Sequence, residues 1–142
     1  MGKNADGSRR IIEEIFGAGN YDLAHELIAA DAVGHDPARP EPTAGPDGLI
    51  ESARGYRDAF PDLKVTANQV IADGDHVAVR WTARGTHKGE LFGIAATGKE
   101  ATVTGITIDR WADGKIAESW TNWDTLGLLQ QHGAVPAAMQ TA

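Results

Sequence analysis

Two long stretches of alternating apolar and polar residues, each flanking an Asp-Gly pair, constrain the fold most strongly. Residues 63–72 and 76–87 flank the sequence ADGD, and residues 101–111 and 115–123 flank ADGK. A period of two is typical of strands with one buried face, and Asp-Gly between such strands indicates a tight turn. The sequence therefore predicts two β-hairpins, joined by a glycine-rich connection over residues 86–100 that holds at most one short strand.

The rest of the chain is predicted to be mainly helical. Helices are expected over residues 8–20, 20–29, 46–60 and 124–133. Ser8 suits the start of the first helix, and Pro46 and Pro61 suit the start and the end of the third. Four prolines and three glycines in residues 34–48 favour an irregular loop. This order predicts an α+β fold, in which a curved mixed or antiparallel sheet wraps around three N-terminal helices.

Composition and charge exclude several classes of protein. A length of 142 residues predicts one domain over residues 1–142, and a net charge of −7 argues against a nucleic-acid partner. The chain has no cysteine, which excludes a disulfide framework, a thiolate metal site and a cysteine nucleophile. The histidines lack the spacing of a zinc site, so we expect no metal. Because no apolar run approaches the length of about 18 residues that would suggest a membrane helix, we predict a cytoplasmic protein without a membrane partner.

The turn of the second hairpin decides which of its faces points inward. A two-residue turn pairs Ala112 with Lys115, whereas a bulged turn pairs Trp111 with Lys115. The two pairings differ by one residue, and such a shift exchanges the faces of a strand. We favour the bulged turn, which places Ile116 on the outer face. The predicted inward face consists of Gly105, Thr107, Asp109, Trp111, Ala117, Ser119, Thr121 and Trp123.

The residues of these hairpins resemble a known family. The sequences GTHKGELFGIAATGKEATVTG at 85–105 and DRWADGKIAESWTNWDTLGLLQQHG at 109–133 are similar to the SnoaL-like polyketide cyclases of the NTF2-like superfamily. HDP at 35–37 and residues 45–85 fit the same family, so the resemblance extends over about residues 8–133. It implies a cone-shaped barrel that forms a homodimer or homotetramer. It also implies ring closure of a polyketide ester by intramolecular aldol condensation, without a metal or an organic cofactor.

The residues that carry out this reaction in the family differ here. Alignment on DGKI places the family's catalytic histidine on Thr107 and its catalytic aspartate on Thr121. Because the reaction needs a base and an acid, other side chains must transfer the proton if the chain is catalytic. The candidates for catalytic residues are His35, Asp109 and Asp124.

Each candidate has a structural alternative. Burial of Asp109 would raise its pKa and make it a base, whereas at a strand end it would be solvated or paired with Arg80 or Arg84. Asp124 suits the cap of the last helix as well as a pocket. His35 is a proton carrier if it lies at the opening of the cone, and otherwise a surface or capping residue.

Aromatic and hydroxyl side chains predict the walls of a binding pocket. The residues expected to contact a ligand are Tyr56, Phe60, Trp81, Phe92, Thr107, Thr121 and Trp123. The leading hypothesis is binding of a small apolar carbonyl compound, with cofactor-free acid/base chemistry such as ring closure or isomerisation. Two alternatives stay open: a hydroxylase-like partner in aromatic polyketide tailoring, and a non-catalytic ligand-binding or dimerisation module.

Overall fold

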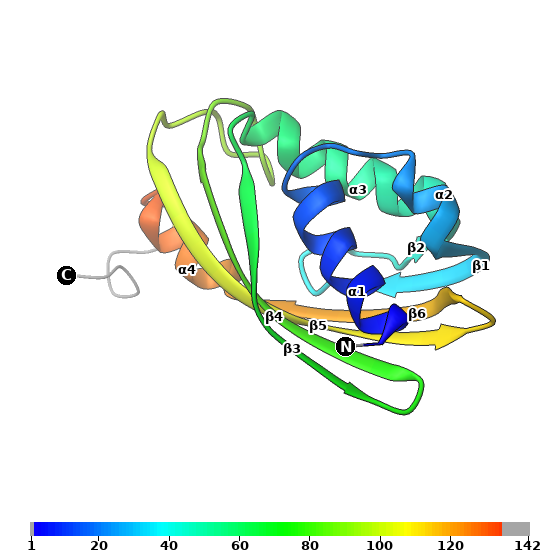
Figure 1. Ribbon diagram of the computed structural model, residues 1–142. Coiled ribbons are helices and arrows are strands. Elements are labelled where there is room, and N and C mark those ends of the chain that lie inside the picture. Colours follow the sequence, from blue (N-terminus) through cyan, green and yellow to red (C-terminus); the bar gives the residue numbers. More distant parts are fainter. Residues whose placement is uncertain (1, 135–142) are drawn as a thin grey trace.

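The computed structural model describes residues 2–134, which form helices around the concave side of one curved sheet (Figure 1). The elements in chain order are α1 (Lys3–Arg10), the π-helical segment η1 (Ile11–Phe16), α2 (Leu23–Leu27), β1 (Ile28–His35), β2 (Thr43–Ala44), α3 (Gly45–Ala59), β3 (Lys64–Asp73), β4 (His76–Thr86), β5 (Glu100–Ala112), β6 (Lys115–Trp123) and α4 (Thr125–Gln131). The predicted α+β fold with three N-terminal helices is confirmed. In the part of the chain that is described, no helix has the length and apolar character needed to cross a membrane.

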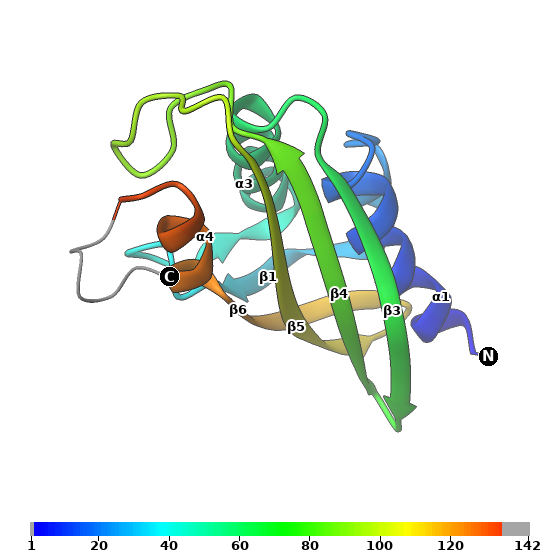
Figure 2. The same cartoon turned by 90° about the vertical axis from the view of Figure 1, so that its left-hand side faces the viewer.

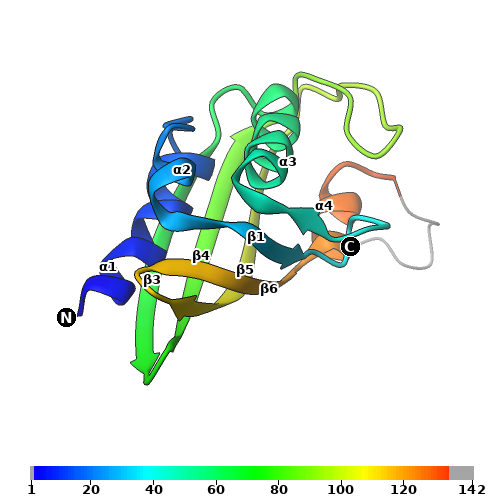
Figure 3. The same cartoon turned by 90° about the vertical axis from the view of Figure 1, so that its right-hand side faces the viewer.

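The six strands form a mixed sheet in the order β2-β1-β6-β5-β4-β3. β1 runs parallel to β6, and every other neighbouring pair is antiparallel. The long strands β3, β4 and β5 bend along their length (Figure 1), and α1 and α3 lie behind them when the sheet faces the viewer (Figure 2). Seen from the opposite side, α3 lies across the concave face and α4 closes one end of the molecule (Figure 3). This curvature creates the space in which the site is found.

The structure corrects the prediction for the segment between the first and third helices. Residues 28–35 form the strand β1, whereas the prediction had a helix up to residue 29, a loop from residue 34 and no strand between them. This strand is rich in alanine and glycine and has little β-propensity of its own, so its pairing with β6 determines its conformation. Ser8 does not begin the first helix, which starts five residues earlier at Lys3, and its side chain is fully buried.

The turn of the second hairpin also differs from the prediction. Asp113 and Gly114 have φ angles of 54° and 80°, and Ala112 pairs with Lys115. Two central residues with positive φ define the two-residue turn that matches the twist of a hairpin. The bulged turn that we favoured is therefore wrong.

A β-bulge next to this turn nevertheless restores the predicted face. The register shifts between the pairs Arg110–Glu118 and Trp111–Ile116, which leaves Ala117 as the extra residue of β6. Beyond the bulge the directly opposed pairs are Asp109–Ser119, Thr107–Thr121 and Gly105–Trp123. These residues share the concave face, as predicted. Ile116 is 2% exposed and lines the concave side, so its predicted outward position is wrong.

Candidate functional site

A cavity of about 150 Å³ lies between the concave face of the sheet and the helical segments η1 and α3. Its walls are mostly apolar, and Ile11, Leu49 and Val65 are typical of them. The polar side chains that line it include Asp36, Ser52, Tyr56, Thr107, Asp109 and Thr121. Few polar groups within apolar walls are typical of small-molecule sites, where they determine the orientation of the ligand.

Asp109 lies at the end of the cavity next to α1, which we call the inner end. The residue is 2% exposed, and its Oδ1 accepts a hydrogen bond of 2.6 Å from the Ser119 hydroxyl. The buried hydroxyl of Ser8 also donates to Asp109, and its oxygen accepts a hydrogen bond of 2.9 Å from Trp111 Nε1. Burial raises the pKa of Asp109 to about 6, and the two hydroxyl donors oppose this rise. A carboxyl with such a pKa can gain and lose a proton near neutral pH.

A pair of threonine hydroxyls lies one step along the strands from Asp109. Thr107 Oγ1 and Thr121 Oγ1 are 2.9 Å apart, and Trp81 Nε1 donates to Thr107 Oγ1 at 3.1 Å. The bond between the two hydroxyls uses one of their two hydrogens. The second hydrogen is not used within the pair, so one threonine can donate to an oxygen of a ligand. Thr107, Thr121 and Trp81 all line the cavity, where they were predicted.

Asp36, Tyr56 and Trp123 form a second polar cluster, at what we call the outer end of the cavity. Asp36 Oδ1 accepts hydrogen bonds of 2.9 Å from both Trp123 Nε1 and the Ala38 backbone N–H, and Oδ2 accepts one of 2.8 Å from the Tyr56 hydroxyl. Burial and the nearby Asp36 carboxylate raise the pKa of Tyr56, so its phenol stays protonated. Tyr56 and Trp123 were predicted to contact a ligand. Asp36 was not among the predicted site residues; the sequence suggested only that it could orient the His35 imidazole or form a turn before Pro37.

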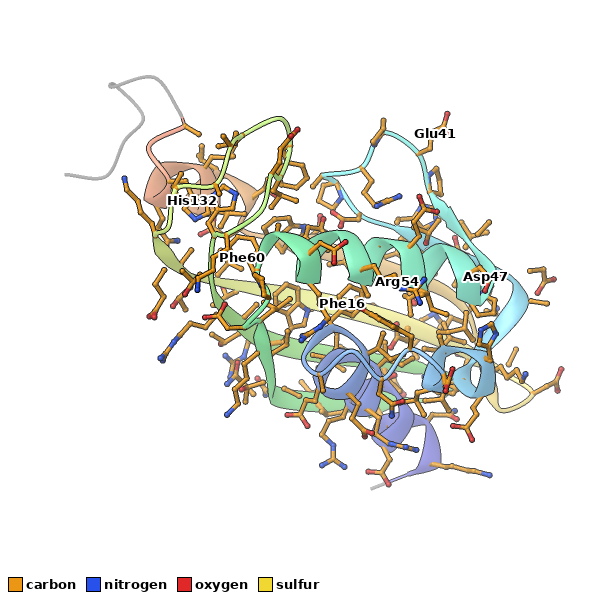
Figure 4. All side chains as sticks on the ribbon, turned by 90° about the horizontal axis from the view of Figure 1, so that it is seen from above. Phe16, Glu41, Asp47, Arg54, Phe60 and His132 are labelled. Atoms are coloured by element: carbon orange, nitrogen blue, oxygen red, sulfur yellow. The ribbon has the colours of Figure 1, made fainter. Side chains whose placement is uncertain are left out.

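Aromatic rings surround the outer end. The Phe92 ring is stacked on Trp123 with a centroid distance of 6.3 Å and meets Tyr56 edge-on at the same distance. Phe92 is 42% exposed and does not line the cavity itself. Phe60 does line the cavity, and it also stacks on the imidazoles of His87 and His132, which stack on each other. Phe60 and His132 are labelled in Figure 4.

Two of the three predicted catalytic residues are engaged elsewhere. Asp124 is exposed and does not line the cavity; its side chain accepts a hydrogen bond of 2.8 Å from the Gly127 backbone N–H and caps α4. His35 borders the cavity, but its Nε2 lies 2.7 Å from Glu118 and its ring stacks on Trp120. Trp120 and Glu118 belong to the outer face of β6, because they alternate with the inward Ser119. The site geometry therefore favours Asp109 and does not support a proton-transfer role for Asp124 or His35.

Comparisons with known proteins identify the family. The sequence profile of the SnoaL-like polyketide cyclases matches residues 8–132. The crystal structure of IdmH from Streptomyces antibioticus, described as a candidate polyketide cyclase, superposes with a TM-score of 0.80 at 33% identity, over 93% of this chain and 99% of IdmH. A comparison with curated proteins finds no match.

Two more distant structures support the fold. AclR from Streptomyces galilaeus, described as a candidate hydroxylase, has a TM-score of 0.81 at 24% identity, over 94% of this chain and 83% of AclR. A hypothetical protein from Catenulispora acidiphila with a ketosteroid isomerase-like fold has a TM-score of 0.75 at 19% identity, over 95% of both chains. The predicted NTF2-like architecture is confirmed. With a family profile that spans nearly all of the described residues, the chain belongs to the SnoaL-like polyketide cyclase family.

Proposed function

We propose that the protein binds a small, mostly apolar carbonyl compound and catalyses cofactor-free proton transfer at the carbon next to the carbonyl, as in aldol ring closure or isomerisation. The observation that carries this proposal is the position of Asp109, a buried carboxyl one strand step from a hydroxyl donor in an apolar cavity. Membership of a polyketide cyclase family supports the same class of substrate.

Asp109 is the base of the proposed reaction. Above a pH of about 6 its carboxylate is ionised and can accept the proton from the carbon next to the carbonyl. The electron pair of that C–H bond then forms the enolate. The hydroxyl hydrogen of the threonine pair that is not used between Thr107 and Thr121 donates a hydrogen bond to the enolate oxygen and stabilises it. In an isomerisation the protonated Asp109 then returns the proton to another carbon. In ring closure the enolate carbon forms a bond to a second carbonyl carbon of the ligand, the π electrons of that C=O become an alkoxide, and Asp109 protonates the alkoxide.

The spacing of these groups suits an enolisable ketone. Successive inward residues of a strand are about 7 Å apart, which separates the Asp109 step from the threonine step. A ketone can bridge a similar distance when its carbonyl oxygen accepts a hydrogen bond from the threonine pair and its neighbouring C–H group contacts Asp109. An apolar cavity of about 150 Å³ accommodates a molecule the size of benzene, so a probe should contain a single ring.

The proposal is tested with 4-hydroxyacetophenone in heavy water, by NMR of its methyl group. The wild-type protein should accelerate exchange of the methyl hydrogens for deuterium, and Asp109→Asn should reduce this acceleration at least about 100-fold. Asp113→Asn is the matched control, because Asp113 is exposed in the hairpin turn and Asn-Gly suits the same turn. Equal exchange by the wild type and Asp109→Asn, or no acceleration by the wild type, would overturn the proposal.

A further inference from the structure

We propose that Asp36, with Tyr56 and Trp123, is a second binding point of the cavity, which accepts a hydrogen bond from a hydroxyl group on the outer end of an aromatic ligand. This inference rests on the proposed function, because it takes the carbonyl group of the ligand to lie at Thr107 and Thr121. It adds a requirement on the substrate class: the ligand carries both a carbonyl and, across a ring from it, a hydroxyl.

The first argument is the hydrogen-bonding capacity that Asp36 retains. A carboxylate offers about four acceptor positions. Three are occupied by Ala38, Trp123 and Tyr56, with two of the three on Oδ1. The remaining position belongs to Oδ2, and Asp36 lines the cavity. The Tyr56 oxygen also remains an acceptor, since its hydrogen is directed to Asp36. These two neighbouring acceptors are matched by a ligand group that donates a hydrogen bond.

The second argument is charge. The described residues form no ion pair with Asp36, and the positive charge of Arg39 has the smallest of the effects that shift the pKa of Tyr56. A carboxylate that lacks an ion-pair partner repels an anionic ligand group, and the second carboxyl of the cavity, Asp109, adds to this repulsion. A neutral hydroxyl therefore fits the outer end better than a carboxylate or a phosphate.

The third argument is shape and spacing. Tyr56 and Trp123 meet edge-on at a centroid distance of 5.8 Å, and flat rings of this kind pack well against an aromatic ligand. The pair Gly105–Trp123 lies one step beyond the pair Thr107–Thr121, or about 7 Å along the strands. The two oxygens of a para-hydroxyaryl ketone lie at opposite ends of one ring, at a separation of this order. One such ring also suits the size of the cavity.

The test compares two ligands of nearly the same shape, 4-hydroxyacetophenone and 4-methylacetophenone, by equilibrium titration. The methyl group fills roughly the space of the hydroxyl but donates no hydrogen bond. The wild-type protein should bind the hydroxyl compound about tenfold more tightly, as expected for a hydrogen bond to a charged group. Asp36→Asn should remove this preference, and Asp113→Asn should keep it. Equal binding of the two compounds by the wild type, or an unchanged preference in Asp36→Asn, would overturn the inference.

Two further measurements make the outcome unambiguous. The comparison of ligands on the wild type alone is decisive if Asp36→Asn does not fold. Tyr56→Phe should keep most of the preference, because the Asp36 carboxylate remains. Binding and hydrogen exchange are separate readouts. A wild-type protein that prefers the hydroxyl compound without exchanging its methyl hydrogens would refute the proposed reaction and leave the second binding point intact.

Discussion

The two carboxyl groups of the cavity have the same chemistry but different surroundings. Asp109 at the inner end is almost completely buried, and its hydrogen-bond donors among residues 2–134 are the hydroxyls of Ser119 and Ser8. Asp36 at the outer end is partly buried and receives two hydrogen bonds from N–H groups and one from the hydroxyl of Tyr56. The difference assigns a reactive role to the first group and a binding role to the second.

The kinds of hydrogen-bond donor at the two carboxyl groups explain this difference in role. A hydroxyl can donate or accept, so Ser8 and Ser119 can reorient when Asp109 gains a proton. An N–H group only donates, so Trp123 and Ala38 hold Asp36 as an acceptor. Carboxyl groups whose environments differ in this way commonly divide the tasks of an active site between them.

The largest expected effect is that the same substitution changes stability in opposite directions at the two ends. Asp109→Asn removes a buried charge, and a rise in pKa from about 4 to about 6 corresponds to about 3 kcal/mol. The free energy of unfolding should therefore increase by up to about 3 kcal/mol at pH 7.5. Asp36→Asn should lower it by about 2 kcal/mol, since hydrogen bonds to a charged acceptor are lost. Urea unfolding measures both values, and a decrease for Asp109→Asn would contradict the assignment of the inner end.

The increase in the free energy of unfolding that Asp109→Asn causes should depend on pH. The folded protein holds the Asp109 proton more tightly than the unfolded chain, so this group stabilises the fold below a pH of about 4 and the contribution is lost as the pH rises to about 6. The difference in unfolding free energy between Asp109→Asn and the wild type should thus be close to zero at pH 4 and reach its full value above pH 6. Hydrogen exchange of the ketone should rise over the same upper range. A difference that does not change with pH would show that Asp109 is not the group responsible.

The inner end was largely predictable from the sequence, whereas at the outer end only the aromatic residues were predicted. Two strands joined by a short turn carry Thr107, Asp109, Ser119 and Thr121. Alternation of the side chains alone therefore places these residues on one face. The error in the turn was compensated by a bulge at Ala117, which nothing in the local sequence predicts. The raised pKa of Asp109 depends on its burial beside Ser8. The two residue numbers differ by 101, so only the folded structure brings these residues together.

The role of Asp36 is the part of the outer end that escaped prediction. Its partners Tyr56 and Trp123 lie 20 and 87 residues away, so only the folded structure brings them together. The strand β1 that ends just before Asp36 was not predicted, because its conformation depends on β6. His35, the neighbouring residue, was a candidate for its proton chemistry, but its ring contacts Glu118 and Trp120 on the outer face of β6.

Removing one donor from Asp36 should have a smaller effect than replacing Asp36. Tyr56→Phe keeps the ring contacts with Trp123 and deletes the hydroxyl that binds Oδ2. The free energy of unfolding should fall by about 1.5 kcal/mol, the lower range for hydrogen bonds to charged groups. Tyr21→Phe is the matched control, because Tyr21 lies outside the cavity. Equal values for the two variants would mean that the phenol does not stabilise the outer end.

The smallest effects are expected from two glycines, one near each end, and they report how rigid the two ends are. A Cβ at Gly7 would lie 2.5 Å from the ring of Trp111, which is buried and bonded to Ser8. Overpacking costs about 1–3 kcal/mol, and the higher helix propensity of alanine offsets about 1 kcal/mol, so Gly7→Ala should destabilise by about 1 kcal/mol. A Cβ at Gly34 would lie 2.5 Å from Thr43 Oγ1, a side-chain atom that can rotate away. Gly34→Ala should therefore change the stability by less than about 0.5 kcal/mol. A greater loss for Gly34→Ala than for Gly7→Ala would show that the outer end is the more tightly packed of the two.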